Sequence, residues 1–418
     1  MGKASFKLGV RKELAMEGAL SGIKVVGFTY AGTANMTMRI LGMHGATVIR
    51  VESKSRPCNL RTGFPFRDNK PGLNRSGYYA MYNNDRYSFG LDLKHSKARQ
   101  VLDRLIQWAD VVVENFSPGT LDRLGLGYEA IRALKPDIIM LSISSQGQTG
   151  PHYLMPSYGP TLAAYVGHTH LCGWPDRGPC MIDQSFPDFI VPAFAAVALI
   201  AALDYKRRRG KGQYIDSSNV EPAVQWIAPV ILDYTANKRV QTRTGNSVPN
   251  AAPHNAYPCK GEDSWCVIAV TSETEWANFC KVIGKVELAN EPMFATLLDR
   301  KRNEAELDRI IEEWTVNLTA SEVMDKMQAA GVPAGKVHSL QGVVEDRQLR
   351  HRGYFRILHH PEIGDYEALA PSYVLSRTPA ELRLPFPCLG EHTEYVCREL
   401  LGMPEKEFIE LLTDNVFE

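Results

Sequence analysis

The sequence has few cysteines and no cysteine pattern that would hold a metal or build a disulfide framework. Its 418 residues include 8 cysteines, which are scattered without a Cys-x-x-Cys pair. This usage is typical of proteins in a reducing compartment. We therefore expect a cytoplasmic protein without structural disulfides.

A net charge is also absent. Lys plus Arg and Asp plus Glu both total 47, which gives a formal charge of +0. No global field would draw such a chain onto nucleic acid or an anionic membrane, so we expect neither as a partner. Any anionic ligand must be met by local cations.

Long hydrophobic runs are scarce as well. The apolar run at 189–203 is shorter than the roughly 20 residues that a membrane span needs, and it predicts a core helix. The N-terminal residues 1–20 are basic and lack an apolar signal core. We expect them to form an arm that precedes the fold, so the sequence predicts no association with a membrane.

Strand and helix patterns alternate through the first half of the chain. The β-rich runs lie at 23–28, 45–52, 87–93, 110–115 and 137–144, and the helical spacings lie at 34–44, 95–109 and 121–134. This alternation predicts βαβ units on a parallel sheet. We expect an α/β protein with a large Rossmann-like domain at 1–225, a smaller α/β domain at 226–345, and a C-terminal segment at 346–418 that returns to the large domain.

Ligands of such sheets bind beyond the carboxyl ends of the strands. The segments to inspect are therefore 28–33, 52–57, 115–119 and 144–150. None of them contains a Gly-x-Gly-x-x-Gly or Walker pattern, so dinucleotide and nucleoside triphosphate binding lose support.

Asp188 stands just before the apolar run and is the first candidate for chemistry. The ordinary interpretation is a helix N-cap. The same position favours a carboxylate by about 0.3–1 kcal/mol through the helix dipole. Because an Asp with a pKa near 3.9 is ionised at neutral pH, it can attack an acyl carbon or phosphorus. Asp183 competes for this role, and composition alone does not choose between the two.

Two further motifs have both an ordinary and a functional interpretation. His168 and His170 would share one face of a strand, as ligands of a zinc hydrolase could, but no set of three or four ligands is visible. The sequence therefore predicts no metal. The cations at 206–211 could hold phosphates, yet they also complement a helix C-terminus, and we favour a structural helix end.

Several motifs follow one another in a specific order and spacing. They lie at 45–52, 83–94, 110–119, 121–125, 209–217 and 389–393. Together they resemble the class III CoA-transferases, the family that includes formyl-CoA and carnitine CoA-transferases. The resemblance covers nearly the whole chain from Leu20 onward.

The resemblance implies that Asp188, rather than Asp183, attacks an acyl-CoA thioester to form a mixed anhydride. CoA then returns to make an aspartyl-CoA thioester, and the acceptor acid takes CoA through a second anhydride. The family also implies an interlocked dimer, which pairs either two copies or two related subunits. Acyl-CoA and a carboxylic acid are the substrates, and no tightly bound cofactor is expected.

The family's CoA site can be carried over residue by residue. It places Leu91 and Lys94 near the nucleotide, Asn115, Phe116 and Arg123 along the pantetheine and pyrophosphate, and Tyr158 near the thioester. Racemases of the same fold use a His at the position of Tyr158, and a tyrosine with a pKa near 10 is a poor base at neutral pH. Transfer is favoured over racemisation or epimerisation. A non-catalytic CoA-binding subunit of a mixed assembly is a further alternative.

The expected substrate follows from what the sequence lacks relative to the family. The glycine tetrad of the formyl-CoA and oxalate branch is absent, which points to a larger acid, such as benzylsuccinate with succinyl-CoA as donor. Ala34 and Asn35 stand where the family usually has Gly-Pro.

Overall fold

The protein divides into two compact units, seen here in a computed structural model that describes residues 18–181 and 186–418. The first unit takes its described residues from 1–166, 183–232 and 350–418, and the second from 167–182 and 233–349. Residues 167–181, expected in the large domain, belong to the second unit by their contacts.

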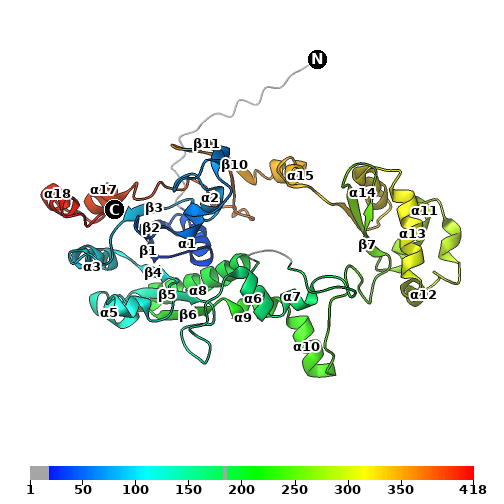
Figure 1. Ribbon diagram of the computed structural model, residues 1–418, viewed down its shortest axis with the longest axis horizontal. Helices are drawn as coiled ribbons and strands as arrows, with labels where there is room; N and C mark the ends of the chain where they lie inside the picture. The colour runs from blue at the N-terminus through cyan, green and yellow to red at the C-terminus, as the bar shows by residue number, and fades with distance from the viewer. Residues whose placement is uncertain (1–17, 182–185) are drawn as a thin grey trace, which may run out of the picture. The chain divides into compact units, whose positions relative to one another are not determined.

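A six-stranded parallel sheet forms the centre of the first unit (Figure 1). Its strands are β1 (Lys24–Phe28), β2 (Thr47–Glu52), β3 (Tyr87–Gly90), β4 (Val111–Glu114), β5 (Ile139–Ser144) and β6 (Tyr214–Ser218). They lie in the order β3-β2-β1-β4-β5-β6, so the predicted parallel α/β sheet is confirmed. The order reverses between β1 and β4, and a ligand crevice is expected beyond the carboxyl ends of these two strands.

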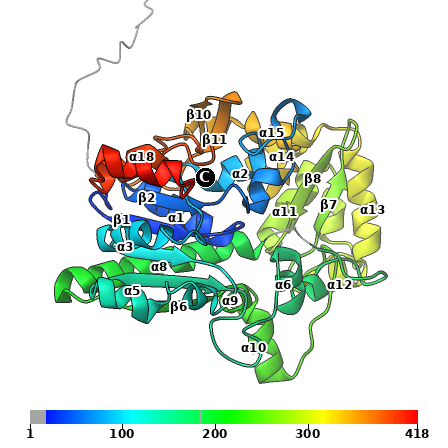
Figure 2. The same cartoon turned by 60° about the vertical axis from the view of Figure 1, so that its left-hand side comes forward.

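Helices cover both faces of the sheet (Figures 1 and 2). α1 (Thr33–Met43) and α8 (Pro187–Arg209) share one apolar core with β1, β4 and β5. The other face packs against α3 (Ala98–Trp108), α5 (Tyr128–Leu134) and the C-terminal α18 (Glu405–Thr413). The C-terminal segment thus returns to the sheet of the first unit.

The remaining elements of the first unit are short. They are η1 (Asn59–Thr62), η2 (Arg67–Asn69), α2 (Gly77–Asn83), α4 (Thr120–Arg123), α6 (Gly159–Tyr165), α9 (Val220–Trp226), β10 (Phe355–His360), β11 (Gly364–Leu369), α17 (Thr393–Tyr395) and η4 (Val396–Leu400). The single helix expected over 121–134 is wrong, because Gly125 adopts a φ of 69° between α4 and α5. This left-handed conformation suits glycine and ends the first helix.

The apolar run that is expected to form a core helix lies in α8, which packs on the sheet by one face. By length and composition it could cross a membrane, with a mean hydropathy of 1.8 and 33% of its most apolar window buried. One face, with Val191 and Leu199, contacts the sheet, while Val197 and neighbouring apolar side chains are exposed. Because the buried face is part of the core, composition alone does not indicate a membrane span.

The second unit is built around an antiparallel sheet in the order β7-β8-β9. Its elements are α7 (His168–Leu171), β7 (His254–Pro258), β8 (Trp265–Ala269), α11 (Glu273–Val282), η3 (Val286–Ala289), α12 (Leu297–Arg302), α13 (Glu304–Thr315), α14 (Ala320–Ala329), β9 (Ala334–Lys336) and α15 (Leu340–Val344). α10 (Ala228–Asn237) and α16 (Arg347–His351) cross the boundaries between the units. α11 begins with a capping box between Ser272 and Glu275.

Candidate active site

The carboxyl ends of β1, β4 and β5 meet at a cavity of about 230 Å³ that Asp188 lines. All of its lining residues belong to the first unit. Three of the segments that follow predicted strands contribute to its wall, namely 28–33, 115–119 and 144–150. The cavity lies where the strand order reverses, which is the expected place for a ligand.

Asp188 lies in the first turn of α8, where the helix dipole favours its carboxylate. The hydroxyl of Thr33, the first residue of α1, donates a hydrogen bond of 2.8 Å to its Oδ1. A Cβ placed on Gly32 would lie only 3.3 Å from its Oδ2, so glycine leaves room beside this oxygen. The first turn of α1 therefore orients the carboxylate.

Asn115 joins the ends of β4 and β1. Its Oδ1 accepts from the main-chain N–H of Tyr30 at 2.7 Å, and its Nδ2 donates to the Tyr30 carbonyl at 2.7 Å. Asn115 lines the cavity, but these two bonds engage its amide with the protein's own main chain. Its side chain supports the cavity wall, and its expected contact with CoA stays a prediction.

Phe116 and Tyr158 line the same cavity as Asp188, and their expected roles toward CoA stay predictions. Tyr158 precedes α6 and is 63% exposed. Phe116 is half-buried and also packs against the core of the first unit.

The other expected CoA residues lie outside this cavity. The Leu91 side chain is fully buried in the core, Lys94 is exposed in the turn after β3, and Arg123 donates to the Thr120 hydroxyl at 3.0 Å. All three follow strands at the carboxyl edge of the sheet. Their roles toward CoA stay predictions.

Thr33 and Gly32 were not singled out from the sequence, although the segment 28–33 was. A polar residue at the start of a helix, in the segment that follows a short strand, is the signal that could have indicated Thr33. Asn219 was missed as well; it lines the cavity, and its main-chain N–H donates to the Ser144 carbonyl at 2.8 Å.

Two sequence candidates have a different outcome. Asp183 lies outside the described residues. His168 and His170 lie on the short helix α7, so their expected placement on one face of a strand is wrong. Within 18–181 and 186–418, no group of three His, Cys, Asp or Glu side chains could hold a metal ion.

The cations at the far end of α8 make ion pairs with neighbouring acids. Lys206 Nζ lies 3.0 Å from Asp110 Oδ1 and 2.9 Å from Asp137 Oδ2, at the amino edge of the sheet. Arg207 and Arg208 pair with Asp204 on their own helix. These contacts support the expected structural helix end.

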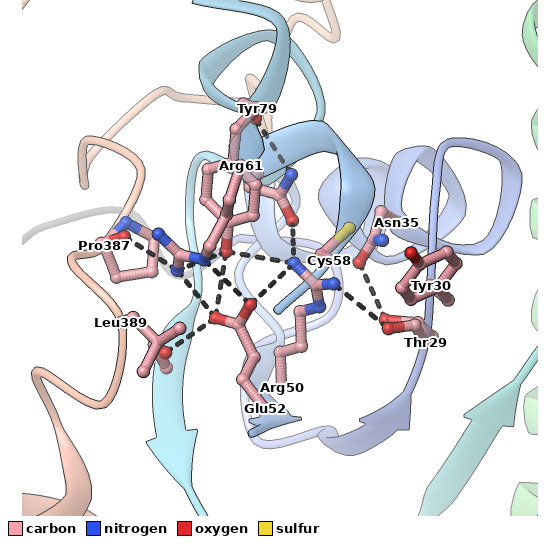
Figure 3. A network of polar contacts seen from close by, with 12 residues as sticks. Thr29, Tyr30, Asn35, Arg50, Glu52, Cys58, Arg61, Tyr79, Pro387 and Leu389 are labelled. Atoms are coloured by element: carbon pink, nitrogen blue, oxygen red, sulfur yellow. Dashed lines mark hydrogen bonds and ion pairs between the residues drawn. The ribbon is translucent and has the colours of Figure 1, made fainter. Parts of the chain in front are cut away.

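A network of buried charges lies behind the loop that follows β1 (Figure 3). Glu52 pairs with Arg61 at 2.7 Å and with Arg50 at 3.1 Å. Burial by itself would raise the pKa of Glu52, but Arg50 and Arg61 outweigh it and lower the pKa to about 2. This acid is therefore ionised throughout the physiological range.

A second buried acid, Glu114, ends β4 on the other side of β1. Burial raises its pKa to about 7, although hydrogen bonds from Ser142 and from the Phe116 N–H favour the ionised form. Glu114 lines a cavity of about 490 Å³ together with Ser142 and Tyr214. The neighbouring acids Asp122 and Asp216 raise the pKa of this carboxyl further.

Known proteins resemble this chain over most of its length. The sequence pattern of CoA-transferase family III matches residues 20–393. A succinyl-CoA–D-citramalate CoA-transferase of Chloroflexus aurantiacus is 33% identical over 380 residues, covering 90% of this chain and 93% of that protein. From the same organism, a succinyl-CoA–L-malate CoA-transferase beta subunit is 28% identical and covers 95% of this chain and 98% of its own length.

A solved structure is also similar. A CAIB/BAIF family protein from Brucella suis superimposes with a TM-score of 0.84 at 29% identity, over 92% of this chain and 100% of that one.

Proposed function

Because the chain belongs to CoA-transferase family III and is a CoA-transferase between acyl-CoA thioesters and carboxylic acids, we propose that Asp188 is its nucleophile. The observation that carries the proposal is the position of this carboxylate, in a cavity at the switch point of the sheet, with Thr33 bonded to one oxygen. A carboxylate placed at a helix start and oriented by a hydroxyl can attack a thioester carbonyl.

The reaction consists of four acyl transfers. Asp188 attacks the donor's thioester carbonyl, the C–S bond breaks, and CoA leaves as a thiolate from a mixed anhydride. The thiolate attacks the Asp188 carbonyl and releases the donor acid, which leaves an aspartyl-CoA thioester. The acceptor carboxylate attacks that thioester, the C–S bond breaks, and CoA leaves as a thiolate from a second anhydride. The thiolate then attacks the acceptor's carbonyl in this anhydride, and the Asp188 carboxylate leaves. Asp188 is regenerated, and no proton is needed overall.

Main-chain N–H groups at the start of α1 are suited to stabilise the tetrahedral species. The first N–H groups of a helix have no partner within the helix. Gly32 and Thr33 bring this helix start to the cavity beside Asp188. Donors fixed at such a position stabilise an oxyanion without reorganisation.

CoA itself extends beyond the cavity in this proposal. About 230 Å³ is small for a ligand of that length, so the cavity holds the acyl group and the thioester. Phe116 and Tyr158 line it, while Lys94 and Arg123 lie outside it at the same sheet edge. We propose that these two cations bind the phosphate groups of CoA.

The lining supports an acid with an apolar or aromatic substituent. Tyr30, Tyr153, Leu154, Met155 and Tyr158 all contribute to the cavity wall. We propose succinyl-CoA as the donor and an acid such as benzylsuccinate as the acceptor. The relatives named above use succinyl-CoA, and their acceptors are citramalate and malate.

The exposed face of α8 supports an assembly of subunits. Phe189, Phe194, Val197 and Ile200 are all at least 44% exposed on this helix. Apolar side chains gathered on one element mark interaction sites. A second copy of the chain or a related subunit would cover them, and one relative is itself named a beta subunit.

A donor and acceptor screen with the Asp188→Asn variant tests the nucleophile. Wild-type protein is incubated with acyl-CoA and acid pairs, the CoA products are read by mass spectrometry, and hydroxylamine is added to trap acylated Asp188 as a hydroxamate. Loss of transfer and of the hydroxamate in Asp188→Asn supports the proposal.

The matched control is Asp204→Asn, at the exposed end of the same helix, which should leave transfer intact. Undiminished transfer by Asp188→Asn would refute the nucleophile, and in a mixed assembly it would indicate a non-catalytic subunit. Exchange of the donor's α-proton with deuterium, without any acceptor, would indicate racemisation instead.

A further inference from the structure

We propose that Asn35 is a positioning residue for CoA transfer: it fixes the loop between β1 and α1 so that Thr33 orients Asp188. This inference rests on the proposed function of Asp188. The loop consists of residues 29–32, and Asn35 lies in the first turn of α1.

Asn35 connects both ends of this loop through its side-chain amide. Its Oδ1 accepts from the Thr29 hydroxyl at 2.8 Å, and its Nδ2 donates to the Ala31 carbonyl at 2.6 Å. Asn115 holds the residue between them, Tyr30, through both main-chain polar groups. Two amides therefore bind three successive residues of the loop.

The loop needs such support because its conformation is unfavourable. Ala31 adopts a φ of 57°, in the left-handed region that costs a residue with a Cβ about 1 kcal/mol or more. The next residue, Gly32, lies beside the Asp188 carboxylate, and the Thr33 hydroxyl donates a hydrogen bond to this carboxylate. A small rotation at Ala31 would move both groups away from the carboxylate.

Asn35 is itself held by a buried arginine. Arg86 donates to the Asn35 side-chain oxygen at 2.9 Å and to its main-chain carbonyl at 2.7 Å. Its other hydrogen bonds go to Asn83 Oδ1 at 3.1 Å and to the Tyr82 carbonyl at 2.9 Å. All these acceptors are neutral.

A fully buried guanidinium on neutral acceptors is costly. Burial, together with the neighbouring Arg50, lowers the pKa of Arg86 to about 9. Arg50 adds a second brace, because its Nη2 donates to the Thr29 carbonyl at 3.0 Å. Figure 3 shows Arg50, Thr29 and Asn35 converging on the start of the loop. The buried arginines therefore donate hydrogen bonds to Thr29 and Asn35, which hold the loop at the site.

Asn35 does not contact the ligand space. Its side chain is fully buried, and the cavity wall is formed by the loop residues in front of it. Substrate binding should therefore be little affected by its replacement, whereas the geometry of the acyl-transfer steps should be. A misplacement of about 1 Å can lower a rate a hundredfold.

The test compares Asn35→Asp with the matched control Asn83→Asp. Asn83 is equally buried, accepts from Arg86 as Asn35 does and also from Arg50, and donates to the Tyr79 carbonyl within its own helix at 2.9 Å. Both changes place a carboxylate against Arg86 and remove one donor. Only the change at Asn35 removes a bond to the loop.

For Asn35→Asp, kcat should fall about tenfold or more, and the KM values for the acyl-CoA and the acceptor should stay within about twofold of wild type. Amide hydrogen exchange at 29–33 should become faster. For Asn83→Asp, kcat and exchange at 29–33 should match wild type. Melting curves check that both variants are folded, and Asn35→Ala, which removes every side-chain bond, should show the larger loss of kcat.

Wild-type kcat in Asn35→Asp, or an equal loss of kcat in Asn83→Asp, would overturn the positioning role. Unchanged exchange at 29–33 in Asn35→Asp would overturn it too, and this readout does not depend on activity. Failure of the proposed function would show separately, as the absence of CoA transfer by the wild-type protein in the donor and acceptor screen.

Discussion

Glu52 and Glu114 end the two strands that flank β1, and both are buried, yet their ionisation differs sharply. On the β2 side, two guanidiniums lower the pKa of Glu52 to about 2 after overcoming the effect of burial. On the β4 side, burial raises the pKa of Glu114 to about 7. Burial favours the neutral acid in both places, and the presence or absence of arginines decides the outcome.

The difference divides the carboxyl edge of the sheet into two environments. The β2 side is a rigid ionic network whose arginines also hold the loop after β1. The β4 side has a cavity that the acids Glu114, Asp122 and Glu129 line. The loop that precedes Thr33 lies between these two sides. Arginines on the β2 side hold it, and Asn115, which follows β4, holds it from the other side.

The largest expected effect is on Glu52→Gln, which would leave Arg50 and Arg61 buried without a carboxylate. We expect a loss of about 3–5 kcal/mol in unfolding free energy at pH 8, measured by urea titration. Because the folded pKa lies below the ordinary 4.5, this contribution is present above pH 4.5 and disappears as pH falls toward 2. An equal loss in the exposed control Glu129→Gln would contradict the ionic role.

Glu114→Gln should have the opposite sign. Because the folded pKa is raised, the contribution of Glu114 to stability is fully present below pH 4.5 and is lost as pH rises through about 7. The variant should therefore match wild type near pH 4 and be about 1–3 kcal/mol more stable at pH 8. Equal stability of both proteins at pH 8 would show that Glu114 is ionised at no cost.

Thr33→Val sharpens the comparison at the loop between the two sides. The change removes the hydroxyl that bonds Asp188 but keeps the side-chain shape. We expect kcat for CoA transfer to fall roughly tenfold, the size of one hydrogen bond to a charged group. Thr37→Val, one turn along α1, where the hydroxyl bonds only the Thr33 carbonyl, is the control and should retain activity. Similar kcat values in the two variants would show that the Thr33 hydroxyl does not orient Asp188.

The smallest effect concerns the opposite edge of the sheet. Lys206→Met breaks the ion pairs with Asp110 and Asp137 and should cost about 1 kcal/mol or less, because these groups are partly exposed. Transfer should be unchanged, since only the carboxyl edge carries the site. A clear loss of kcat with an unchanged melting temperature would assign the amino edge a role in catalysis.

Much of the sheet could be predicted from the sequence. Apolar β-branched runs such as 48–51 and 111–113 must be buried on both faces, and their alternation with helices fixes a parallel topology. That topology places the carboxyl ends of the strands at one edge, so the sequence alone predicts the segments that surround the site. The choice of Asp188, and of its expected neighbours, depended on the family resemblance.

The charged network could not be predicted in this way. Arg50 interrupts an apolar strand and Arg86 follows a helix, and both resemble ordinary surface cations in sequence. Their partners are distant in the chain, since Asn35 and Arg86 are 51 residues apart. The helix at 187–209 shows the same limit, because composition reports how apolar a helix is but not which of its faces is covered.

If a second copy or a related subunit covers the exposed face of α8, as we propose, protein concentration becomes a thermodynamic variable. A subunit that covers this face would bind the folded chain and not the unfolded one, so mass action would couple folding to association. Dilution would then lower the melting temperature without any change in the sequence or buffer. The lifetime of the folded chain in a cell would then depend partly on how quickly a newly made copy associates with the subunit that covers this face.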